Sequence, residues 1–104
     1  PDLIFPGAKE YHNILFESEK LVFLGAKTTC KDRWRQIINE ADRINIKHLF
    51  TLQQGISSNQ LREMKRERVK LVVPQSYISS FPPEFRSEIF SLHSFIGMVR
   101  TLQL

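Results

Sequence analysis

The chain has 104 residues, with 15 lysines and arginines against 11 aspartates and glutamates and a formal net charge of +4. This length allows one domain or less, and because the chain opens on Pro1 rather than Met we expect a part of a larger protein. The single cysteine excludes an internal disulfide, and no apolar run approaches the roughly 18 residues of a membrane span. We expect a cytoplasmic domain, and its positive charge fits an anionic partner such as nucleic acid.

The first part of the chain predicts two short strands. Residues 3–5 are apolar and precede the Pro6-Gly7 turn signal, which is typical of a strand, whereas the mixed residues 8–19 predict a loop. Residues 21–24 are apolar throughout, as in a strand that is buried on both faces of a sheet.

An amphipathic helix is predicted over residues 29–44, because apolar side chains recur there at three- and four-residue steps. Its apolar stripe consists of Trp34, Ile37, Ile38, Ala41 and Ile44. We interpret Trp34 as a core residue rather than a platform for base stacking, and Cys30 as a packing residue at the edge of the stripe.

The remainder of the chain continues the alternation of strands and helices. Residues 48–52 and 69–73 predict strands, and Ser57 with Gln60 has the spacing of a capping box at a helix start. A final helix is predicted over residues 84–101, with an apolar stripe of Phe85, Ile89, Leu92, Ile96 and Val99. The alternation predicts an α/β fold, in which helices cover the faces of a sheet.

Three residues suggest chemistry at one edge of this sheet. Asp2 begins the first predicted strand and Lys27 follows the second, so the two can lie side by side, and Glu40 can reach them from the next helix. Carboxylate oxygens are ligands for Mg²⁺, and phosphodiester hydrolysis needs a metal ion or cation that faces the developing negative charge. These residue types are common, so the spacing alone is a weak signal.

The sequence around these residues closely resembles the catalytic domain of EcoRII-type restriction endonucleases, a branch of the PD-(D/E)XK nuclease superfamily that reads CC/GG-containing sites. The matching segments are residues 1–2, 27–36, 40–44, 48–53, 59–60 with 63–64, and 71–74. The most specific part is the string KTTCKDRWR at residues 27–35. The resemblance implies a PD-(D/E)XK restriction-endonuclease-like core, with a central mixed sheet flanked by helices. Residues 1–104 would form one catalytic domain that lacks its N-terminal portion.

The resemblance also implies roles for the three residues. Asp2 becomes the metal-binding aspartate, Lys27 the catalytic lysine, and Glu40 the second metal-binding carboxylate, with Mg²⁺ as the cofactor. In most of the superfamily that carboxylate stands two residues before the lysine, where this chain has Gly25. In the EcoRII-type branch a glutamate on the following helix replaces it. The alternative for Lys27 is a solvated lysine at the end of a strand.

Lys31, Asp32 and Arg33 fall where the branch carries a basic-acidic-basic recognition triplet. Arg or Lys can donate to guanine O6 and N7, and Asp can accept from cytosine N4, so a triplet of this order can read G·C pairs in the major groove. The alternative is an ordinary charged first turn of a helix. His48 has no metal-ligand spacing to the other histidines, which favours a structural or surface role for it.

These inferences predict a type II restriction endonuclease of the prokaryotic cytoplasm. It would hydrolyse double-stranded DNA with Mg²⁺ at a CCWGG-like site, and it would act as a homodimer, because two-fold symmetric proteins match palindromic sites. Two alternatives remain open at this point: a different PD-(D/E)XK nuclease such as a repair enzyme, and a DNA-binding module that does not cleave.

Overall fold

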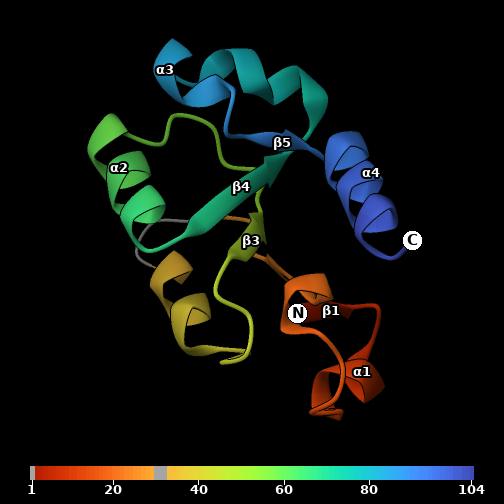
Figure 1. The fold of residues 1–104 in the computed structure, drawn as a ribbon. Coiled ribbons are helices and arrows are strands. Elements are labelled where there is room, and N and C mark those ends of the chain that lie inside the picture. The colour runs from red at the N-terminus through yellow and green to blue at the C-terminus, as the bar shows by residue number, and fades with distance from the viewer. Residues whose placement is uncertain (1, 30–32) are drawn as a thin grey trace.

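The computed structural model describes residues 2–29 and 33–104, with the backbone alone at Arg33. A five-stranded sheet in the order β1-β2-β3-β4-β5 runs through it (Figure 1). The strands are Asp2–Phe5 (β1), Val22–Ala26 (β2), Lys47–Phe50 (β3), Val69–Val73 (β4) and Phe90–Ser91 (β5). The first two strands pair antiparallel and the remaining neighbours pair parallel, so the sheet is mixed, as predicted.

Short helices connect the strands. They are Ala8–His12 (α1), Ser18–Lys20 (η1), Arg33–Asn39 (η2), Ser58–Arg66 (α2), Gln75–Ser80 (η3), Pro83–Arg86 (α3) and Leu92–Leu102 (α4), where η denotes a 3-10 helix. The predicted cap of α2 is confirmed: the Ser57 hydroxyl accepts a hydrogen bond of 3.2 Å from the backbone N–H of Gln60. In the described parts of the chain, no helix has the length and apolar character needed to span a bilayer.

The sheet has a core on each face. On one face the 3-10 helix η2 and the helices α2 and α3 cover side chains such as Phe23, Leu49 and Leu71. On the other face α4 packs Phe95 against Val22 and neighbouring residues. Figure 1 shows α2 and α4 on opposite sides of β4. Strand β2 is therefore covered on both faces, as its continuous apolar sequence predicts.

The predicted helix over residues 29–44 is wrong in length and in type. The described part is a 3-10 helix that ends at Asn39, and at Ala41 the backbone enters the left-handed region with φ 51°. The apolar stripe is nevertheless real, because Trp34, Ile37 and Ile44 are buried. The apolar periodicity correctly predicted that these side chains are buried. The backbone that buries them is a short 3-10 helix followed by a turn. Residues 8–19, predicted as a loop, contain α1 and the first two residues of η1.

The predicted final helix over residues 84–101 is also wrong, because the chain forms α3, β5 and α4 there. Phe90 and Ser91 pair with Val72 and Val73 of β4, so a long-range strand pairing interrupts the helical pattern. The Ser91 hydroxyl then caps α4 by accepting a hydrogen bond from the backbone N–H of Ser94. Within the predicted stripe, Leu92 and Ile96 are 43% and 42% exposed. The buried face of α4 carries Val99, as predicted, together with Phe95, which the predicted stripe omitted.

His48 occupies the core under α4, where its ring lies 5.4 Å from that of Phe90 and 5.1 Å from that of Phe95 between centroids. The pKa of His48 is lowered to about 4, first by burial and then by the nearby charge of Lys70, and a backbone hydrogen bond to Phe23 opposes both. Its Nδ1 is buried without a hydrogen-bond partner among the described residues. His48 is therefore a neutral core residue at neutral pH.

This burial predicts a loss of stability in acid. An unfolded histidine has a pKa near 6.5 and the folded one about 4, so the unfolded state binds more protons as the pH falls through this window. We expect the folded protein to lose about 3 kcal/mol through His48 between pH 7 and pH 4. Urea unfolding of the wild type and of His48→Phe at pH 7 and pH 4 measures this loss of stability. An equal acid loss in the variant would contradict the assignment.

Candidate active site

The antiparallel pairing of β1 and β2 places Asp2 next to the end of the second strand. Asp2 lies opposite Gly25 in the ladder, and Lys27 stands two residues after Gly25, directly after the end of β2. The backbone N–H of Lys27 donates to the carbonyl of Phe50 at 3.0 Å, so the chain at Lys27 is still held to β3. The predicted neighbourhood of Asp2 and Lys27 is present at this edge of the sheet.

Glu40 reaches the same place from the end of η2. A hydrogen bond between its carboxyl group and that of Asp2 is the largest cause that raises the pKa of Glu40, followed by burial and the negative charge of Asp2. The positive charge of Lys27 opposes the shift. The structure thus brings the three predicted residues together, although Glu40 stands at the bend after a 3-10 helix and not within an α-helix.

Gly25 leaves the room that this arrangement needs. A Cβ atom at this position would lie 3.3 Å from Oδ1 of Asp2 and 3.2 Å from Cγ2 of Ile37. Both distances are tighter than ordinary van der Waals contact, so a side chain at position 25 would require the Asp2 carboxylate and the Ile37 side chain to shift by a few tenths of an ångström.

Gly25→Ala is expected to perturb the site directly. The added methyl group must push Asp2 or Ile37 by a few tenths of an ångström, and overpacking of this kind costs about 1–3 kcal/mol. We expect a cleavage rate at least roughly tenfold lower, since small displacements of catalytic groups have large effects. Gly97→Ala in α4 is the matched control, because its Cβ would meet nothing within 4 Å. Plasmid cleavage and urea unfolding measure both effects, and equal behaviour of the two variants would contradict the crowding.

Two carboxylates at this edge suit a hard divalent cation. The Glu40 Oε2 atom is buried without a hydrogen-bond partner among the described residues, and the pair of carboxyl groups raises the pKa of one of them. A bound cation would satisfy the oxygen and relieve the repulsion. The described residues contain no group of three or more His, Cys, Asp or Glu side chains placed for a metal. Mg²⁺ nevertheless uses only one or two carboxylates, with water and phosphate as its other ligands.

Comparison with known proteins identifies the family. The sequence profile of the family described as EcoRII C terminal matches residues 1–96. The chain belongs to the EcoRII C-terminal family. It is 53% identical over 97 residues to the Type II restriction enzyme EcoRII of Escherichia coli. The match covers 93% of this chain and 24% of that relative, so the chain spans about a quarter of the relative's length.

Solved structures agree with this family at the level of the fold. Metal-depleted Ecl18kI in complex with uncleaved DNA superposes with a TM-score of 0.79, and its complex with uncleaved, modified DNA with a TM-score of 0.78. In both cases the likeness covers 95% of this chain and 33% of the other chain, at 20% sequence identity. The fold of this EcoRII C-terminal family member is therefore the PD-(D/E)XK-like restriction endonuclease fold.

The predicted recognition triplet lies largely outside the described residues. Lys31 and Asp32 are not described, and Arg33 is described only as the first backbone position of η2, so their roles stay predictions. The adjacent part of η2 is firmly attached to the rest of the domain. Arg35 forms an ion pair with Glu63 of α2, and its guanidinium lies 4.7 Å from the centre of the Trp34 ring.

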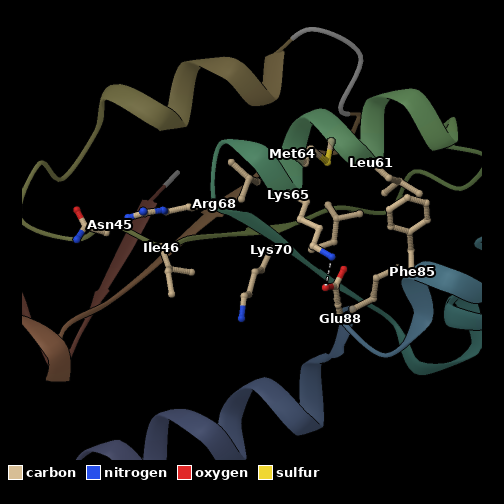
Figure 2. Close-up of a pocket in the computed structure, with 12 residues that line it drawn as sticks. Asn45, Ile46, Leu61, Met64, Lys65, Arg68, Lys70, Phe85 and Glu88 are labelled. Carbon is tan, nitrogen blue, oxygen red and sulfur yellow. Dashed lines mark ion pairs between the residues drawn. The ribbon is translucent and has the colours of Figure 1, made fainter.

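An apolar groove of the described surface lies away from the carboxylates. Figure 2 shows it between α2, β4 and the segment after α3, where Lys65 and Glu88 form an ion pair of 2.9 Å. Its lining includes residue 45 before β3 and Val69 at the start of β4, whereas Lys27 follows the end of β2. Because β2, β3 and β4 run parallel, the groove lies at the amino ends of these strands and the candidate site lies at their carboxyl ends.

Sequence reasoning did not single out Lys47 and Arg43, two cations that hold the surroundings of the site. Arg43 donates to the carbonyls of Tyr11, Asn13 and Phe16 and thereby fixes the segment between β1 and β2. Lys47 is only 4% exposed, and burial lowers its pKa against the charges of Asp42 and Glu40. The position of Lys47 at the start of an apolar strand could have indicated its role, because a buried lysine needs hydrogen-bond partners inside the protein.

Proposed function

We propose that the full-length protein is a type II restriction endonuclease that hydrolyses double-stranded DNA with Mg²⁺, and that residues 1–104 are part of its catalytic domain. The observation that carries the proposal is the convergence of Asp2, Lys27 and Glu40 at one edge of the sheet. Membership of the EcoRII C-terminal family supports it, as does the restriction-enzyme function in the name of the E. coli relative. The DNA complexes of Ecl18kI support duplex DNA as the substrate class.

Each residue has a distinct task in this proposal. Asp2 and Glu40 hold Mg²⁺, which, when bound, lowers the pKa of a water ligand and neutralises charge on the scissile phosphate. Lys27 presents its ammonium group to the attacking water or to a phosphate oxygen, where it favours the negative charge that develops in the transition state. Its backbone bond to Phe50 holds it on the sheet rather than on a free loop, so this cation is positioned before the substrate arrives.

The sequence specificity would come from the start of η2. In this proposal Lys31, Asp32 and Arg33 read the outer G·C pairs of a CCWGG-like site through the major groove. The ion pair between Arg35 and Glu63 would link η2, beside the triplet, to α2. A palindromic site is matched by a homodimer, and the bacterial relative points to the cytoplasm of a prokaryote.

Cleavage of a plasmid that carries CCWGG and related sites tests the proposal. The full-length wild type is expected to yield discrete fragments with Mg²⁺ and none with EDTA, and Asp2→Asn and Glu40→Gln are expected to yield none. Glu84→Gln, at an exposed carboxylate of α3, is the matched control and should cleave normally. An intact plasmid that is bound at these sites would instead indicate a DNA-binding module. Cleavage without sequence preference would indicate a different nuclease, such as a repair enzyme.

A further inference from the structure

Lys47 reaches from the sheet to the turn that follows Glu40. Its backbone lies at the start of β3, and its ammonium group donates to the carbonyl oxygen of Ala41 at 2.8 Å and to that of Ile44. The same group lies 5.8 Å from the centre of the Phe23 ring. Two carbonyls and one aromatic face surround the charge, as a buried ammonium group requires.

The turn that Lys47 holds has an unfavourable backbone. The N–H of Glu40 donates to Ile37, which ends the 3-10 helix, and Ala41 then adopts φ 51°. A residue with a Cβ atom is disfavoured in this left-handed region by about 1–2 kcal/mol, and such residues persist only when their surroundings impose the conformation. The N–H of Ile44 closes the turn on the Ala41 carbonyl at 2.9 Å. That carbonyl is also an acceptor for Lys47.

The base of Lys47 is rigid and is shared with the candidate site. Lys47 pairs with Phe23 in β2 and with Val69 in β4, and its N–H donates to the carbonyl of Arg68 at 3.0 Å. Phe23 stands two residues before Gly25, which faces Asp2. Because alternate residues of a strand share one face, the sheet fixes Lys47 relative to the Asp2 carboxylate.

We propose that Lys47 is a positioning residue of the active site: by holding the carbonyls of Ala41 and Ile44, it directs the Glu40 carboxyl group toward Asp2. This inference rests on the proposed function, in which Asp2 and Glu40 bind the metal together. Lys47 itself touches neither metal nor DNA. It acts through the backbone of the residue that follows Glu40, as supporting groups around metal ligands commonly do.

Calorimetric titration of the full-length protein with Mn²⁺ tests the inference without relying on cleavage. Lys47→Met keeps an unbranched side chain up to the ε position and removes the ammonium group. We expect it to weaken Mn²⁺ binding at least about tenfold, within the range for groups that orient metal ligands, and to accelerate hydrogen exchange at the Ile44 amide. Val99→Ala, a buried change in α4 on the other face of the sheet, is the control for lost stability and should bind Mn²⁺ normally.

Glu40→Gln separates failure of the inference from failure of the proposed function. If Glu40→Gln binds Mn²⁺ as the wild type does, the proposed metal site itself is wrong. If Glu40→Gln loses affinity but Lys47→Met binds like Val99→Ala, the site stands and the role of Lys47 is overturned. Should Lys47→Met be too unstable to measure, the same comparison is made in the Gly97→Ala background, where the helix is expected to gain about 0.5–1 kcal/mol.

Discussion

Replacement of Lys27 with alanine is expected to lower the rate of DNA cleavage by about 10²–10³-fold, the usual effect of removing one group that stabilises transition-state charge. The carboxylates of Asp2 and Glu40 remain in Lys27→Ala, so metal binding should persist. The fold should also persist, because Lys27 follows β2 at its end and its backbone bond to Phe50 does not depend on the side chain. Single-turnover cleavage with Mg²⁺, beside Mn²⁺ calorimetry, measures the two properties separately.

The control for Lys27→Ala is Lys9→Ala, which removes an exposed lysine of α1 and changes the net charge equally. It should cleave at the wild-type rate. Cleavage by Lys27→Ala at a rate within a few fold of wild type would assign the reaction to other residues. It would also return Lys27 to the alternative reading, a solvated lysine at the end of a strand.

Trp34→Ala is expected to lower the free energy of unfolding by about 3–5 kcal/mol, as large-to-small changes of buried aromatic residues do. Trp34 is completely buried and belongs to the core between η2 and the sheet. Urea unfolding followed by circular dichroism is the measurement, because Trp34 is the single tryptophan of these 104 residues and the variant lacks it as a fluorescent probe. Since η2 leads into Glu40, the affinity for Mn²⁺ should fall as well.

Trp34→Phe distinguishes lost packing from a lost polar group. The Trp34 Nε1 atom is buried without a hydrogen-bond partner among the described residues, so its removal leaves no acceptor unsatisfied. We therefore expect a smaller loss of stability from phenylalanine than from alanine, in proportion to the smaller cavity. Equal losses in the two variants would show that the indole N–H has a partner that matters.

Local signals in the sequence correctly predicted much of this fold. The strand at residues 69–73 has the predicted bounds, because an apolar run flanked by turn residues is readable from neighbours in the chain. The cap at Ser57 is also correct, since a cap involves residues only three apart. The neighbourhood of Asp2 and Lys27 followed from their positions at the beginning of one strand and the end of the next.

Other features depend on partners that lie far away in the sequence. At Phe90 the chain leaves its helical pattern because it pairs with the free edge of β4. The residues near Phe90 in the sequence give no signal of this pairing. After η2 the chain turns at Ala41, and the carbonyl of Ala41 accepts a hydrogen bond from Lys47 on a separate strand. Apolar periodicity predicts which side chains are buried, but it does not predict the backbone that buries them.

The candidate site divides in the same way. The sequence by itself determined which residue types are present, their order, and the family to which they belong, because covalent neighbours and local patterns carry that information. Only the tertiary structure decided that Glu40 lies beside Asp2, that a Cβ atom at Gly25 would crowd Asp2, and that Lys47 bonds the turn after Glu40. These are contacts across the sheet, and their geometry exists only after the strands have paired and the core has packed.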